Sequence, residues 1–72
     1  MDSFTPEQAR VLSGLSQEKI AKMLGISKNG YIKKEKGESR FFVDEALKFS
    51  EIVKIPMEKI VFLPNAFHKN GT

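Results

Sequence analysis

The residues with the clearest chemical potential lie between positions 28 and 33. Lysine donates hydrogen bonds to guanine O6 and N7, and asparagine pairs bidentately with adenine N6 and N7. Lys28 and Asn29 are adjacent, and on a helix Lys33 falls one turn further along the same side. Ile32 adds an apolar side chain suited to a thymine methyl group. These side chains have the chemistry to contact DNA bases; the alternative is that the two lysines contact only phosphate.

Residues on either side of this group carry charge and donors suited to a phosphate backbone. Residues 17–40 hold seven basic and three acidic residues, a net charge of +4, whereas the whole chain carries +3. Such a basic stripe predicts phosphate binding, although a solvated lysine-rich surface would have the same composition. The expected phosphate contacts are Gln17, Lys36, Ser39 and Arg40.

Two short helices joined by a tight glycine turn must position these side chains. Ser16 is a good N-cap for a helix over Gln17–Leu24, and Gly25 supplies the left-handed residue that ends it. Ser27 caps a second helix, Lys28–Lys36, two residues later. Because the turn is so short, the two helices must cross steeply. This is the arrangement of a helix-turn-helix motif, which here spans residues 17–36.

The segments on both sides of the motif are also predicted to be helical. Thr5 caps a first helix that begins at Pro6 and runs to about Ser13. A fourth helix follows a loop over residues 38–42, because residues beyond the loop recur at helical spacing. These recurring residues are Val43, Ala46, Leu47, Ser50 and Val53.

A short fifth helix completes the predicted domain. Pro56 opens it, Ile60 and Val61 close the core, and Pro64 ends it. No segment alternates as a strand, so we expect an all-α, compact five-helix domain over residues 1–64. Residues 65–72 are expected to form a flexible C-terminal tail.

The segment from residue 5 to about residue 63 resembles the Cro/CI-type (XRE-like) helix-turn-helix family. The positions that match the family pattern are Arg10, Leu15, Gln17, Ile20, Ala21, Leu24, Gly25, Ser27, Glu35, Gly37, Val43, Leu47, Val53, Ile55 and Ile60. The resemblance implies a lambda-repressor-like DNA-binding fold with base-reading residues at Lys28, Asn29 and Lys33. It also implies a structural ion pair between Arg10 and Glu35.

Three features depart from the usual pattern of that family. Gly30 lies inside the predicted recognition helix, where glycine costs about 0.5–1 kcal/mol relative to alanine. Lys34 occupies a position that many members fill with an apolar residue. Phe41 and Phe42 precede the predicted fourth helix, where polar capping residues are commoner. Together with Tyr31 they form an aromatic group beside the recognition helix, and aromatic residues dominate protein–protein hot spots. We therefore expect these three to form a partner interface; the alternative is that they fill the core.

Two functions follow from these features, and the similarity to small temperate-phage regulators suggests both. In the first, the chain is a Cro-like repressor that forms a homodimer and reads an operator in a lysis/lysogeny-type switch alongside a partner repressor. Phe62, Leu63 and Phe67 are then candidates for the dimer patch, or they seal the core. In the second, the chain is an antirepressor of the modulator-of-repression kind. It masks the DNA-binding domain of the phage repressor.

Composition argues against most other classes of protein. The 72 residues include no cysteine and one histidine, His68, so we expect no metal, no cofactor and no enzymatic activity. No apolar run approaches the length needed to cross a bilayer, and no signal peptide is evident, so we expect no membrane association and a location in the cytoplasm of a host bacterium. An antidote of a toxin–antitoxin pair remains an alternative, because fold alone does not fix function.

Overall fold

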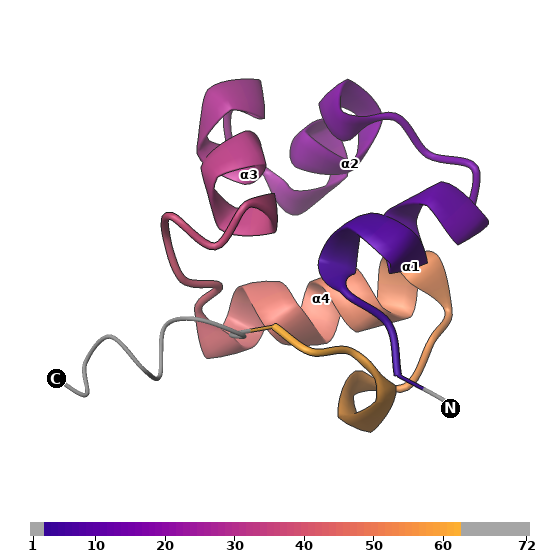
Figure 1. The fold of residues 1–72 in the computed structure, drawn as a ribbon. Coiled ribbons are helices and arrows are strands. Elements are labelled where there is room, and N and C mark those ends of the chain that lie inside the picture. Colours follow the sequence, from indigo (N-terminus) through magenta and orange to yellow (C-terminus); the bar gives the residue numbers. More distant parts are fainter. Residues whose placement is uncertain (1–2, 63–72) are drawn as a thin grey trace, which may run out of the picture.

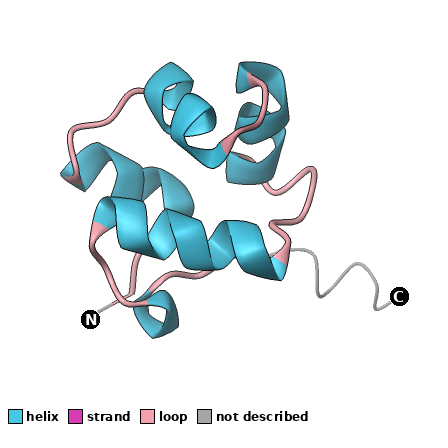
Figure 2. Cartoon of the chain, turned by 180° about the vertical axis from the view of Figure 1, so that it is seen from behind, coloured by secondary structure: helices cyan, strands magenta, loops and turns pink. Residues whose placement is uncertain are grey.

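The computed structural model describes residues 3–62, and the expectations for residues 63–72, including the tail, Leu63, Pro64, Phe67 and His68, lie outside the described residues. The described part contains four α-helices and one short 3₁₀ helix, with no named strand. The elements in chain order are α1 (Pro6–Leu12), α2 (Gln17–Leu24), α3 (Lys28–Glu35), α4 (Val43–Val53) and η1 (Met57–Lys59). Helices α2 and α3 lie together on one side, and α4 runs beneath them (Figure 1). Seen from behind, α4 lies in front of the other helices (Figure 2).

The expected capping residues begin the first three helices. Thr5 accepts a hydrogen bond from the backbone of Gln8, whose side chain accepts one from the backbone of Thr5, so this is a capping box. Ser16 and Ser27 cap α2 and α3 in the same way through their side-chain oxygens. Gly25 ends α2 with φ of +77°, a left-handed conformation that favours glycine. The helix-turn-helix motif therefore forms where the sequence predicts it.

An aromatic cluster fills the space between α3, α4 and the chain beyond η1. Tyr31 and Phe49 are completely buried, and the rings of Phe41, Phe49 and Phe62 contact one another, with the Phe41 centroid 5.5 Å from that of Phe49 and 5.0 Å from that of Phe62. Offset and edge-on aromatic pairs at these distances stabilise a core beyond the burial of area alone. Phe62 therefore helps to seal the core within its own chain, which was one of its two expected roles.

The fourth helix has the predicted range but turns a different face inward. Its buried residues are Ala46, Phe49 and Val53, whereas Val43 and Leu47 are 75% and 51% exposed. The helical spacing of apolar residues therefore predicted the helix correctly. It predicted the buried face only in part, because Val43 and Leu47 are exposed. The three buried residues follow the same helical spacing from Ala46, and the large Phe49 occupies the centre of the core instead of Leu47.

The predicted fifth helix is shorter than expected. It is a single 3₁₀ turn, after which Ile60 is buried and Val61 is 42% exposed. Around Ile60 the chain pairs with the N-terminal segment: the amide of Phe4 donates to the Lys59 carbonyl, and the amide of Val61 donates to the Phe4 carbonyl, each at 2.8 Å. Both ends of the domain are thereby joined. Among residues 3–62, no helix is long and apolar enough to span a membrane.

Candidate nucleic-acid interface

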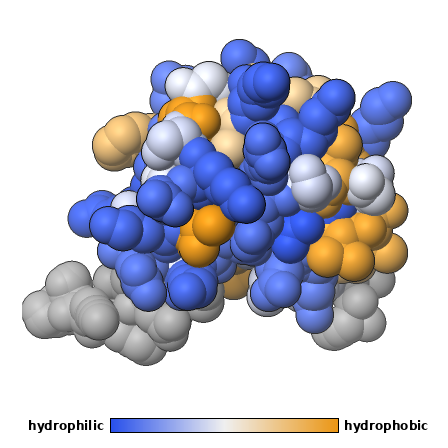
Figure 3. All heavy atoms as spheres, turned by 90° about the horizontal axis from the view of Figure 1, so that it is seen from above, coloured by the Kyte–Doolittle hydropathy of each residue, from blue (hydrophilic) through white to orange (hydrophobic). Residues whose placement is uncertain are grey.

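The side of α3 that faces away from the core carries the predicted base-reading residues. Lys28, Asn29 and Lys33 are exposed, and Ile32 is partly exposed beside them. Seen from the side on which α2 and α3 lie, the surface is mainly hydrophilic (Figure 3). Because the opposite side of α3 is held by the buried Tyr31, the helix presents these four side chains together.

Gly30 allows the first turn of α3 to close tightly on its cap. The Gly30 amide donates to Ser27 Oγ at 3.0 Å, and a Cβ atom built on Gly30 would lie 3.1 Å from the same oxygen. A side chain at this position would therefore press on the capping oxygen. Gly30 therefore fits closely against the N-cap of α3, next to the base-reading residues.

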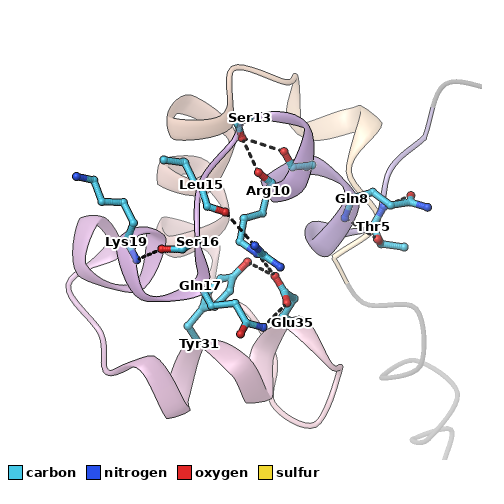
Figure 4. Close-up of polar contacts among 11 residues, drawn as sticks. Thr5, Gln8, Arg10, Ser13, Leu15, Ser16, Gln17, Lys19, Tyr31 and Glu35 are labelled. Carbon is cyan, nitrogen blue, oxygen red and sulfur yellow. Dashed lines mark hydrogen bonds and ion pairs between the residues drawn. The ribbon is translucent and has the colours of Figure 1, made fainter.

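A polar network behind α3 fixes its position relative to the first two helices (Figure 4). Arg10 Nε donates to Glu35 Oε2 at 2.7 Å, which is the expected ion pair, and Arg10 Nη1 donates to the Leu15 carbonyl at 2.9 Å. Tyr31 Oη also donates to Glu35 Oε2 at 2.7 Å, and Gln17 Nε2 donates to Glu35 Oε1 at 2.8 Å. Glu35 thus accepts from donors on α1, α2 and α3 while its side chain is only 4% exposed.

This network changes the role expected for Gln17. The side-chain nitrogen of Gln17 is turned inward to Glu35 instead of outward to a phosphate (Figure 4). The first helical residue of α2 was expected to grip a DNA backbone through that donor. In the structure its nitrogen orients the recognition helix, so a direct contact to phosphate through this nitrogen is not supported.

Hydrogen bonding and burial shift the pKa values of the acid and the phenol in this network. Burial tends to raise the pKa of Glu35, but hydrogen bonds from Arg10, Gln17 and Tyr31 outweigh burial and hold its pKa below the ordinary value. Burial and the hydrogen bond to Glu35 raise the pKa of Tyr31, so the phenol remains a donor. The hydrogen bond to Glu35 raises the pKa of Arg10 further.

The lowered pKa of Glu35 predicts a loss of stability in acid. A carboxyl with a depressed folded-state pKa contributes stability above its unfolded value of about 4.3, and this contribution disappears as the pH falls through the folded pKa. We expect the melting temperature of the wild type to fall more steeply below about pH 4.5 than that of Glu35→Gln, which is less stable at neutral pH. Thermal unfolding followed by circular dichroism from pH 7 to pH 3 measures the melting temperatures of the two proteins. Parallel curves for the two proteins would contradict the role given to Glu35.

The chain that follows α3 carries three of the expected phosphate-binding residues. The amides of Glu38 and Ser39 both donate to the Lys33 carbonyl, at 2.8 and 3.2 Å, so the loop folds back on α3. Lys36 and Arg40 are exposed, and Ser39 is partly exposed. The exposed cations lie close in sequence to the base-reading row, as expected of groups that would contact phosphate.

The expected aromatic interface is only partly present. Tyr31 is completely buried and Phe41 is 7% exposed, so neither is available to a partner; both belong to the core. Phe42 alone is exposed, at 64%, next to the exposed Val43 and Leu47. The two buried rings pack against Phe49, an anchor that the sequence reasoning did not single out.

The remaining chemistry of the described residues is limited. Residues 3–62 contain no group of three or more His, Cys, Asp or Glu side chains that could hold a metal ion. No buried side-chain nitrogen or oxygen among them lacks a hydrogen-bond partner. Exposed cations on α2, α3 and the chain that follows are Lys19, Lys22, Lys28, Lys33, Lys36 and Arg40.

One known protein family matches the sequence of this domain. A helix-turn-helix family, HTH_3, matches residues 7–60 of the chain, which covers α1 to α4 and η1. No curated protein and no solved structure matches the sequence. The match extends over three quarters of the chain and includes the whole recognition helix. The chain therefore belongs to the XRE-like (Cro/CI-type) helix-turn-helix family of DNA-binding transcription regulators.

Proposed function

We propose that the protein reads an operator with α3 as a regulator of a phage lysis/lysogeny-type switch, acting alongside a partner repressor. The observation that supports this most is the division of α3 into two sides. One side presents Lys28, Asn29 and Lys33 to solvent, and the other is held by Tyr31 and Glu35. A recognition helix with a fixed inner side offers its outer residues to a major groove in one register.

The proposed division of labour follows from the chemistry of the exposed groups. Asn29 would pair with adenine, Lys28 and Lys33 would donate to guanine, and Ile32 would contact a thymine methyl group. Exposed Lys36 and Arg40, with the partly exposed Ser39, would contact phosphate and set the register. Two copies of the domain would place two such helices about 34 Å apart on a pseudo-palindromic site.

Fluorescence anisotropy tests this function directly. The full chain is titrated into DNA selected from a randomised library, with a scrambled duplex as control, at about 50 and 200 mM salt. Selective binding that stays well above the scrambled background at the higher salt supports operator reading. Equal and weak binding to both duplexes would reject it.

A second function, that of an antirepressor, is favoured by one specific observation. The side chains of Phe42, Val43 and Leu47 are exposed at the beginning of α4, and they form what we call the α4 apolar patch. Exposed apolar groups of this kind are common in protein-binding surfaces. In this function the patch would bind the DNA-binding domain of the phage repressor and block its access to the operator.

Truncation of the patch separates the two functions. We expect Phe42→Ala to abolish any release of the repressor from its operator, because aromatic anchors carry much of the binding energy at interfaces. Leu12→Ala is the matched control, because Leu12 is equally exposed, at 65%, on a different helix. Competition anisotropy with labelled operator and purified repressor measures the release. If both variants release the repressor as well as the wild type, the antirepressor function through this patch is wrong.

A further inference from the structure

Lys34 is a basic residue of α3 that does not face the solvent side of the helix. Its side chain is 11% exposed, and Nζ makes three contacts within the protein. It forms an ion pair with Glu45 Oε1 at 3.0 Å, and it donates to the Arg40 carbonyl at 2.9 Å. It also lies 4.6 Å from the centroid of the Phe42 ring, within the range of a cation–π interaction.

These polar contacts join three segments that the aromatic cluster also holds together. Lys34 belongs to the last turn of α3, Arg40 to the loop, and Glu45 to the first turn of α4. Glu45 Oε1 also accepts a hydrogen bond from the Phe42 amide at 2.9 Å, so the same carboxylate caps the fourth helix. The lysine that replaces the usual apolar residue therefore connects the recognition helix to the start of α4.

The loop is attached to α3 in two different ways. Its first half is held by backbone bonds, since the amides of Glu38 and Ser39 donate to the Lys33 carbonyl. Its second half is held to α3 by the hydrogen bond from Lys34 to the Arg40 carbonyl and by the packing of the buried Phe41 ring against Tyr31. Phe41 fixes the chain on one side of Arg40, and the Lys34 ammonium holds the Arg40 backbone itself through its carbonyl, so the position of the exposed Arg40 side chain depends in part on Lys34.

We infer that Lys34 is a positioning residue for DNA binding, which acts by holding Arg40 at the phosphate-contacting edge of the surface. This rests on the proposed function of α3 and the loop in binding DNA. Lys34 does not contact phosphate itself, because its ammonium is already occupied by Glu45 and by the Arg40 carbonyl. Its positive charge offsets Glu45 instead of contributing to the exposed basic surface.

A double-mutant cycle tests the coupling between Lys34 and Arg40. The variants are Lys34→Met, Arg40→Ala and the double variant, and the probe is a labelled duplex of about 20 base pairs, which holds two half-sites one helical turn apart. We expect each single change to weaken binding roughly three- to tenfold at low salt, as for the loss of one phosphate contact. The double variant is expected to bind no more weakly than Arg40→Ala, because Lys34 acts through Arg40.

Lys33→Met is the matched control for this cycle. It removes the same charge from the adjacent position of the same helix, but Lys33 is exposed. Its effect is expected to add to that of Arg40→Ala, since the two side chains would contact DNA independently. Additive effects for Lys34→Met as well would overturn the inference and assign Lys34 an ordinary electrostatic role.

Hydrogen exchange in the free protein provides a readout that does not depend on DNA. We expect Lys34→Met to speed exchange of the Phe42 amide about tenfold and to leave the amides of Glu38 and Ser39 unchanged, because only the second half of the loop is released. An unchanged exchange rate of the Phe42 amide would contradict the claim that Lys34 holds the second half of the loop. A wild-type chain that binds no duplex at all would reject the proposed function, whereas wild-type binding with additive variants rejects only the role of Lys34.

Glu45→Gln keeps the test decisive if Lys34→Met does not fold. This change raises the net charge of the chain from +3 to +4, so simple electrostatics predicts tighter DNA binding. If Glu45 instead helps Lys34 to hold Arg40, binding becomes weaker or stays unchanged despite the added charge. Tighter binding by Glu45→Gln would contradict the inference.

Discussion

Replacement of Arg10 by methionine is expected to unfold most of the protein at room temperature. The change removes the charged donor to Glu35 and leaves a carboxylate that is only 4% exposed. Breaking a buried ion pair from one side costs about 3–5 kcal/mol, and a single small core seldom supplies more than about 3–5 kcal/mol in total. The Leu15 carbonyl also loses its side-chain donor. Circular dichroism melting of the wild type and Arg10→Met measures the loss; an unchanged melting temperature would contradict the structural role of the pair.

A second variant distinguishes two contributions to the lost stability: the unpaired buried carboxylate of Glu35 and the lost packing of the Arg10 side chain. In Arg10→Met/Glu35→Gln the amide oxygen of the glutamine still accepts from Tyr31, and no buried charge remains. We therefore expect the double variant to melt at a higher temperature than Arg10→Met alone, since the coupling between contacting residues is large. If the double variant is the less stable of the two, the main contribution of Arg10 is the packing of its side chain.

Replacement of Asn29 by alanine is expected to reduce selective DNA binding strongly while leaving the fold intact. Asn29 is exposed in the first turn of α3, so its side chain is not part of the core. A bidentate contact between asparagine and adenine contributes about 1–3 kcal/mol of discrimination, which corresponds to about 5- to 150-fold in affinity for the selected site. Anisotropy titrations on the selected and scrambled duplexes measure this difference.

Lys36→Ala is the control for base reading by Asn29. Lys36 is exposed at the end of α3, where we assign it to phosphate. Its loss is expected to weaken binding to both duplexes by a similar factor and to reduce the slope of log K against log salt by about one. If Asn29→Ala behaves in the same way as Lys36→Ala, then Asn29 does not read bases.

The helix boundaries were predictable from sequence because they depend on local chemistry. Ser16, Ser27 and the capping box at Thr5 act within one turn of their own helices, and Gly25 ends α2 by its own backbone conformation. The Arg10–Glu35 pair joins distant residues, and it was found only through the family pattern. Gln17, which also donates to Glu35, was expected to contact phosphate, because the sequence does not reveal which side chains are turned inward.

The errors concern the choice of inward-facing side chains, which depends on tertiary packing. Val43 and Leu47 fit the helical period as well as Ala46 does, yet Phe49 fills the core and they remain exposed. Tyr31 and Phe41 were expected at a partner surface, but their rings pack against Phe49. Lys34 departs from the family pattern, and its ammonium is paired with Glu45 and donates to the Arg40 carbonyl.

The most direct test of the central claim is an amide chemical-shift map of the chain on addition of its selected duplex. If α3 reads DNA, the largest changes will lie in residues 27–36 and at Ser39 and Arg40, with little change at Phe42 and Leu47. Changes centred on Phe42 and Leu47, or the same small changes with a scrambled duplex, would contradict operator reading by this helix.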